Sequence, residues 1–414
     1  MIYGKNTKLF VFPIVLLYLC TNIKTGIRMV RIKIGLLARI IIAIALGIGL
    51  GNLIPAACVR VFVTFNGIFS EFLGFVIPLI ILGLVTPAIA DIGKEAGKML
   101  VVTAVVAYVA TLFSGFLAYF AGVTFFPSMI TPGVSIEQIS ESRDILPFFS
   151  VAIPPVMNVM SSLVLAFMLG LGIAHLDTQA LKQICQESKK IIIQVIQSVI
   201  LPLLPVYIFG IFLNMTHSGQ VYGILLVFIK IIGVIFLLHI LLLLLQFMVA
   251  GFFVRRNPFR LLARMLPAYF TALGTQSSAA TIPVTLRQTI KNGVSEGIAG
   301  FVIPLCATIH LSGSTLKIVC CAMALMIMQG MPFDFPMFAG FIFMLGITMV
   351  AAPGVPGGAI MAALGVLSSM LGFGESEQAL MIALYIAMDS FGTACNVTGD
   401  GAIALIMDKC FRKS

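Results

Sequence analysis

The chain has 414 residues, of which 60% are hydrophobic and only 10% charged, against roughly 25% charged residues in soluble domains. A soluble fold of this composition would expose many apolar side chains, so the chain is expected to lie in lipid. The net charge of +10 does not indicate nucleic-acid binding, because Lys and Arg stand at the ends of apolar runs without interleaved aromatic residues. The eight cysteines are scattered and lack the spacing of a metal site.

The first 28 residues are expected to be an N-terminal extension or a weakly interfacial segment. Their apolar run over residues 9–20 is too short to cross about 30 Å of hydrocarbon as a helix. Met29 offers a second plausible translation start, with basic residues directly before a full-length apolar span. We therefore expect one membrane domain over residues 29–414 and assign no function to residues 1–28.

Six apolar stretches follow, each long enough to cross a membrane as a helix. They lie near residues 34–54, 62–90, 99–126, 148–175, 190–213 and 221–254, with polar segments at 91–98, 127–144 and 176–190. Most of the 25 Lys and Arg residues fall on one side if the N-terminus is cytoplasmic. Cytoplasmic loops carry the excess of Lys and Arg. We therefore predict a multi-pass protein of the inner (plasma) membrane with both termini cytoplasmic.

The second half of the chain is interrupted twice by residues that disfavour a continuous helix. The first interruption reads GTQSSAATIPVT over residues 274–285, and the second reads AAPGVPGGA over residues 351–359. At membrane depth, irregular backbone occurs only where protein surrounds it or a cavity adjoins it. We therefore predict two re-entrant helical hairpins, at 262–292 and 336–374, that form an inverted repeat around a site near the midplane.

Two carboxylates lie deep within the last apolar span, which reads MDSFGTACNVTGDGAIALI from Met388. Asp389 and Asp400 are about three helical turns apart, and Thr393 and Asn396 share their helix face. An ionised carboxylate at the bilayer centre costs at least about 2.5–3.5 kcal/mol, so both need cationic partners. This span supplies no Lys, Arg or His. We expect a bound metal cation or a ligand ammonium; the alternative is two protonated or hydrogen-bonded structural aspartates.

The seventh span carries a second polar cluster, CATIHLSGSTLK over residues 306–317. Its Ser-Gly-Ser sequence at 312–314 predicts a locally unwound stretch whose carbonyls can bind a hard cation. His310 is either a hydrogen-bonded packing residue or a proton carrier. A serine hydrolase is disfavoured because no GxSxG motif occurs. The LGIGLG run at 46–51 predicts close helix packing through small residues rather than a dinucleotide loop.

At these residues the chain resembles the dicarboxylate/amino acid:cation symporter family, which includes glutamate and neutral amino acid transporters. The resemblance covers roughly residues 30–410. It is carried by the serine-rich first hairpin (Ser277, Ser278, Thr281, Pro283), the ATI stretch Ala307 to Ile309, the second hairpin Gly354 to Gly358 and the NVTGD run Asn396 to Asp400.

The resemblance implies a homotrimer of eight transmembrane helices plus two hairpins per chain, working as an elevator-type transporter. Spans one, two, four and five (about 34–90 and 148–213) would form a static scaffold. A mobile transport subdomain would comprise about 99–126 and 221–408, with both hairpins.

The resemblance also implies residue roles. Asp389 would bind the substrate ammonium, Ser278 its carboxylate, and Thr393 and Asn396 its other polar groups. Other residues placed at the substrate are Ser277, Thr308, Val355, Gly357 and Gly392. Transported sodium ions would contact Thr308, Asn396, Asp400, Tyr108, Thr111, His310 and Ser312. No organic cofactor is implied.

One departure from the family pattern concerns the substrate. Members that take acidic substrates carry an arginine where this chain has Gly392, and several carry another where it has Gln276. A second buried carboxylate without a cation would cost several kcal/mol, so a neutral amino acid is implied. Lys317 lies two turns beyond His310 and could replace the arginine only if it turned inward, which we do not expect.

A second departure concerns ion coupling. The Asn-Met-Asp motif of the family is His310-Leu311-Ser312 here, and position 112, often a serine, is Leu112. A third sodium site is therefore expected to be weak or absent, and His310 raises the alternative of proton coupling.

The sequence thus predicts a secondary active symporter, not an enzyme, that imports a small neutral amino acid with sodium by alternating access. The first alternative is a dicarboxylate or acidic amino acid symporter driven by sodium or protons. The second is a channel-like or transport-dead membrane sensor. An intramembrane hydrolase is the least favoured reading.

Overall fold

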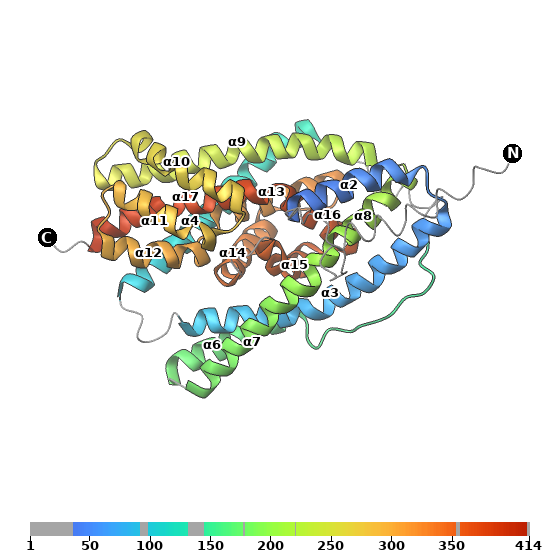
Figure 1. Ribbon diagram of the computed structural model, residues 1–414, viewed down its shortest axis with the longest axis horizontal. Helices are drawn as coiled ribbons and strands as arrows, with labels where there is room; N and C mark the ends of the chain where they lie inside the picture. Colours follow the sequence, from blue (N-terminus) through green and yellow to red (C-terminus); the bar gives the residue numbers. More distant parts are fainter. Residues whose placement is uncertain are drawn as a thin grey trace, which may run out of the picture.

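The computed structural model describes residues 36–91, 98–130, 145–176, 179–219, 221–352 and 357–411. Every regular element in these ranges is a helix, which confirms the predicted all-α class (Figure 1). The N-terminal extension, the polar segment at 131–144 and Val355 lie outside the described residues.

The helices of the first half follow the predicted spans with two corrections. They are α2 (Leu36–Gly51), α3 (Ala56–Asp91), α4 (Lys98–Met129), α6 (Val159–Leu176), α7 (Gln179–Val195), the π-helical turn η1 (Ile196–Ile200), α8 (Leu201–His217) and α9 (Val221–Val254). The fourth span was predicted from residue 148, but α6 begins at Val159. The segment before α6 contains Pro154 and Pro155, which disfavour a helix.

The second correction concerns the polar segment at 176–190, which was predicted to separate two spans. Its residues 179–190 are instead helical, and α7, η1 and α8 form one apolar helix over Gln179–His217. Residues 179–190 include no Gly or Pro and are mostly good helix formers. Hydropathy alone therefore misplaced the start of this helix.

The second half forms four pairs of helices. They are α10 (Pro258–Thr275) with α11 (Ser278–Lys291), α12 (Glu296–Ile309) with α13 (Ser312–Gln329), α14 (Phe335–Ala351) with α15 (Gly358–Leu371), and α16 (Glu375–Ala387) with α17 (Asp389–Phe411). Within the first pair, and likewise within the third, the two helices pack against each other, at the positions of the two predicted hairpins. The second pair is one apolar span broken at residues 310–311, and the fourth bends by 63° at Met388.

The apolar helices are those of a multi-pass membrane protein. Within the described residues, five helices are long and apolar enough to cross a membrane, and a sixth does so if α16 and α17 count as one bent span. The shorter apolar helices are Ala38–Gly51, Val164–Leu176, Phe335–Ala351 and Gly358–Leu371.

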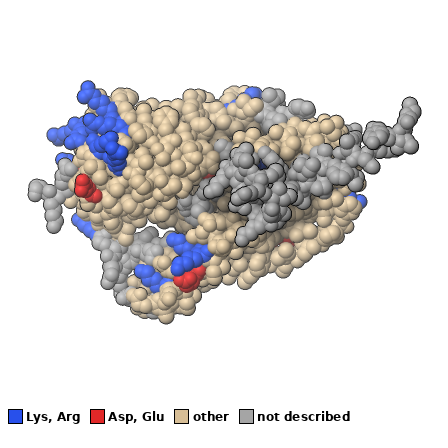
Figure 2. All heavy atoms as spheres, in the orientation of Figure 1, with Lys and Arg blue, Asp and Glu red and all other residues tan. Residues whose placement is uncertain are grey.

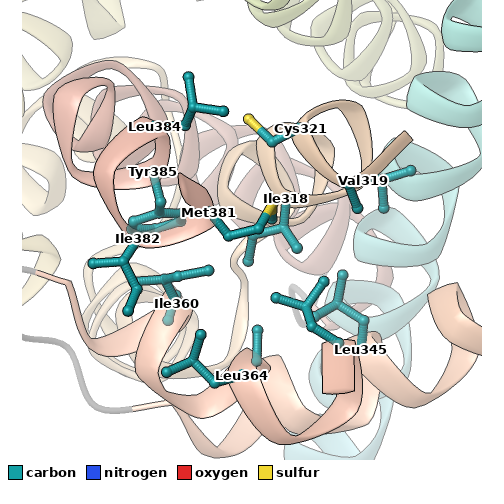
Figure 3. Packing of buried hydrophobic residues seen from close by; sticks show 14 of the residues in the cluster. Ile318, Val319, Cys321, Leu345, Ile360, Leu364, Met381, Ile382, Leu384 and Tyr385 are labelled. Carbon is teal, nitrogen blue, oxygen red and sulfur yellow. The ribbon is translucent and has the colours of Figure 1, made fainter. Parts of the chain in front are cut away.

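Helix α13 lies at the centre of the molecule, where each of its residues from Ser312 to Met328 is buried. It packs against α4, α9, α14, α16 and α17. Figure 3 shows part of this core, in which Ile318 of α13 lies among Leu345 of α14, Leu364 of α15 and Met381 of α16. A helix buried on all sides brings its polar residues into the core with its apolar ones.

Basic residues gather at one end of the molecule (Figure 2). Helix α10 follows Arg255 and Arg256 and carries Arg260 and Arg264, while α7 carries Lys182, Lys189 and Lys190. The long tan surface between the ends agrees with an apolar belt facing lipid.

The small residues of the 46–51 run let α2 approach α8 closely, as predicted. A Cβ on Gly47 would lie 2.9 Å from Cβ of Phe212 and 3.0 Å from the carbonyl oxygen of Phe209. A Cβ on Gly51 would overlap Thr216, whereas one on Gly49 would meet nothing within 4 Å.

We predict that Gly51→Ala lowers the stability of the detergent-solubilised protein by about 1–3 kcal/mol, because overpacking pushes α2 away from α8. The matched variant Gly49→Ala should be neutral or slightly stabilising, because alanine favours the helix by up to about 1 kcal/mol. Thermal unfolding of both variants checks this. Equal melting temperatures would show that α2 does not depend on this contact.

Candidate functional site

Four polar side chains line one face of α17 inside the protein. Asp389, Thr393, Asn396 and Asp400 are all buried, and each of the two aspartate side chains is no more than 5% exposed. Water cannot solvate these carboxylates where they lie, so the protein must supply partners to them.

Asp389 is paired with Lys317 of α13. The Lys317 Nζ lies 3.4 Å from Oδ1 of Asp389, and the lysine side chain is fully buried. Nζ also donates to the carbonyl oxygen of Tyr385 at 3.2 Å and lies 3.3 Å from the centre of the Tyr385 ring. The expectation that Lys317 does not turn inward was therefore wrong. The cation that residues 388–406 lack comes from α13.

The ammonium of Lys317 fills the space beside Gly392. A Cβ on Gly392 would lie 2.9 Å from Nζ and 3.2 Å from Cε of Lys317. The glycine therefore makes room for the lysine, and position 392 does have a cation next to it.

Asp389 also contacts the second hairpin. The backbone N–H of Gly357 donates to Oδ2 of Asp389 at 2.9 Å. Gly357 has a φ of 73°, a conformation that favours glycine, and it stands directly before α15. Both oxygens of this carboxylate thus have partners within the protein.

Asp400 is paired with His310, at the break between α12 and α13. The His310 Nδ1 lies 2.8 Å from Oδ1 of Asp400, and both side chains are buried. A metal cation was one of the partners expected for this carboxylate, and the structure places an imidazole there. Within the described residues, no group of three or more His, Cys, Asp or Glu side chains is placed to hold a metal ion.

Asn396 of α17 hydrogen-bonds backbone N–H groups at the break between α12 and α13. Its Oδ1 accepts from the N–H groups of Gly313, at 2.8 Å, and Ser314, at 3.3 Å. Its Nδ2 donates to Oγ of Ser314 at 3.1 Å. These are N–H groups of the first turn of α13, which have no partner within that helix.

Two residues of α9 complete the surroundings of the break. His239 Nε2 donates to the carbonyl oxygen of Gly313 at 2.9 Å, and Gln246 Nε2 donates to Oγ of Ser312 at 3.1 Å. The Gly313 carbonyl was predicted to be open to a cation, but it accepts this bond. His239 and Gln246 were not predicted from the sequence. Their spacing of two helical turns within an apolar span places two polar side chains on one helix face, which could have indicated a buried polar contact.

The tip of the first hairpin meets the beginning of α17. Ser277 is the N-cap of α11, and its side chain accepts from the N–H of Ala280. Gln276 adopts a left-handed conformation and donates from Nε2 to Oγ of Ser390 at 3.0 Å. Ser278 is buried in the first turn of α11. The N–H groups of that turn form a local positive end directly after Gln276, which contacts Ser390 of α17.

Other residues predicted at sodium sites hydrogen-bond to the backbone. Tyr108 donates to the carbonyl oxygen of Phe343 in α14, and Thr111 to that of Ala107 in its own helix. Thr308 is exposed and donates to Leu305.

A separate cavity of about 530 Å³ lies between α3, the segment before α6, and α15 with α16. Ser70, Glu71 and Glu375 are among its polar lining residues. None of the site residues predicted from the sequence lines this cavity.

Comparisons with known proteins show which family the sequence matches. A model of the sodium:dicarboxylate symporter family matches residues 36–410. The serine/threonine transporter SstT of Acinetobacter baylyi is 28% identical over 402 residues, which is 92% of this chain and 98% of that protein. Human excitatory amino acid transporter 1 is 29% identical over 299 residues, or 68% of this chain and 53% of that protein. The chain thus spans about half the length of this second relative.

We predict that Asp389→Asn destabilises the protein by about 3–5 kcal/mol, because it leaves the Lys317 ammonium buried without its counter-ion. The double variant Asp389→Asn/Lys317→Met should recover most of this loss. Thermal unfolding in detergent measures both. As a control, Glu187→Gln removes an exposed ion pair with Lys190 and should change stability little. A double variant no more stable than the single one would contradict the pairing.

Proposed function

Because the chain belongs to the sodium:dicarboxylate symporter family, we propose that it is a secondary active transporter that imports a small amino acid together with a cation. The observation that carries the proposal is the buried polar face of α17, which carries Asp389, Thr393 and Asn396. The beginning of this helix contacts both helix pairs, through Ser390 with Gln276 and through Asp389 with Gly357.

The substrate ammonium binds Asp389 in this proposal, and the substrate carboxylate meets the N-terminal end of α11 at Ser278. Both relatives described above are named as amino acid transporters, which favours an amino acid over a plain dicarboxylate. A dicarboxylate also has no ammonium to place on Asp389.

The side chain of the substrate is a separate question. A neutral amino acid was predicted because Gly392 removes the arginine that pairs with an acidic side chain. A neutral substrate follows from Gly392 only if position 392 has no cation nearby. The Lys317 ammonium lies beside this position. Gly392 therefore does not argue against an acidic amino acid.

A division into scaffold and transport parts is supported by the packing. Helices α2 and α8 pack together, as do α3, α6 and α7, while α13 and α17 pack with α4, α9 and the first hairpin. We propose that the first group is the scaffold of a homotrimer and that the second moves with both re-entrant hairpins. The basic end of the molecule would face the cytoplasm.

Sodium is the proposed coupling cation, as cargo at Asp400. In this structure Oδ1 of Asp400 accepts from His310, and Oδ1 of Asn396 accepts two N–H groups. A sodium ion at Asp400 therefore competes with the imidazole.

The first test is uptake into proteoliposomes of labelled serine, alanine, aspartate and succinate, driven by an inward sodium gradient, a proton gradient or neither. Gradient-driven amino acid uptake with counterflow is the expected result, since a carrier exchanges bound substrate across the membrane. Flux without saturation would indicate a channel, and no binding of any amino acid would indicate a sensor or another cargo.

We further predict that His310→Asn increases the apparent affinity for sodium by about tenfold or more. The variant removes a hydrogen bond to a charged group that competes with the ion, typically about 1.5–3 kcal/mol. The sodium dependence of uptake measures this change. The control variant Thr124→Ala removes an exposed hydroxyl bonded within its own helix and should leave the sodium dependence unchanged. An unchanged affinity in His310→Asn would show that the imidazole and sodium do not compete.

A further inference from the structure

We propose that Lys317 is a tethered cation that determines the substrate class. Its ammonium holds Asp389 while the site is empty. It binds the side-chain carboxylate of an acidic amino acid once the substrate ammonium has taken Asp389. This proposal rests on the proposed function and names the substrate class for the same site.

The contacts of Lys317 are those of a cation built into the site. Nζ lies 3.4 Å from Asp389, donates to the Tyr385 carbonyl oxygen and lies over the Tyr385 ring. Two of these contacts, with the carbonyl and the ring, do not depend on Asp389. They can therefore keep the ammonium in place when the carboxylate changes partner.

The need of the buried Lys317 ammonium for a carboxylate then selects the substrate class. Asp389 and Lys317 are both buried and compensate each other. A substrate ammonium that takes Asp389 leaves the lysine without a counter-ion, and leaving a buried charge uncompensated is strongly unfavourable. An acidic amino acid can place its side-chain carboxylate beside Lys317, whereas serine or alanine has only the α-carboxylate, which the proposed function places at the N-terminal end of α11.

Gly392 makes room for the ammonium of Lys317 beside α17. A side chain there would collide with Nζ of Lys317, and the nearest other polar atom to a Cβ at this position is Oγ of Ser314, at 3.7 Å. Lysine has a flexible four-carbon stem, so its ammonium can move between two acceptors without a change in the backbone. The glycine is thus the counterpart of the lysine rather than a sign of a neutral substrate.

The test measures binding of aspartate, serine and succinate to the purified protein by competition, together with uptake. Lys317→Met should weaken aspartate binding at least tenfold relative to serine binding, which should not weaken because the variant removes the ammonium that competes for Asp389. Lys230→Met is the matched control, because that exposed lysine donates only to the carbonyl oxygen of Met129 and should alter neither.

A second variant keeps the proposal testable if Lys317→Met folds poorly. Lys317→Met/Gly392→Arg moves the cation to the neighbouring helix and should restore the preference for aspartate over serine. Equal losses for aspartate and serine in Lys317→Met, or no rescue in a folded double variant, would overturn the role of Lys317. A wild-type preference for serine would also overturn it while leaving the proposed function intact, whereas a preference for succinate would contradict the amino acid substrate of the proposed function as well. Failure of the wild type to bind or carry any amino acid would instead refute the proposed function.

Discussion

Burial of two carboxylates on α17 is the constraint on which the rest of the site depends. Asp389 and Asp400 lie where water does not reach, so each needs a polar partner at hydrogen-bonding distance. Lys317 pairs with Asp389 and the imidazole of His310 pairs with Asp400, in the order that follows from α13 running antiparallel to α17. These two pairs specify the register of the two helices more strictly than apolar packing alone would.

The break between α12 and α13 follows from the same requirement. His310 reaches Asp400 from an extended residue that ends α12, and Leu311 separates it from α13. The backbone groups released there find partners in Asn396 and His239. Polar residues scattered through apolar spans are therefore the partners that a broken helix needs in the absence of water.

The sequence predicted most apolar spans and a pair of helices at each hairpin position, because span length and proline-glycine interruptions are local properties. The start of α6 and the continuity of α7 into α8 were missed, since hydropathy does not register a polar helix. The direction of Lys317 was wrong for a different reason. Helix α13 is buried on every side, so its sequence has no polar face to show where a lysine points. The partners of Asn396 on α13 also depend on tertiary packing.

Hydrogen bonds through the centre of the site connect the Lys317–Asp389 pair with the His310–Asp400 pair. Asn396 donates to Ser314, and the Ser314 hydroxyl lies 3.0 Å from the Tyr385 hydroxyl, whose ring lies under Lys317. Asn396 also holds the first turn of α13, directly after the residue that pairs with Asp400. Coupling between two sites requires an element with two states that both sites bias. If Lys317 exchanges Asp389 for a substrate carboxylate, it provides two such states. Tyr385, Ser314 and Asn396 then connect these states to the surroundings of Asp400, where the proposed sodium ion binds.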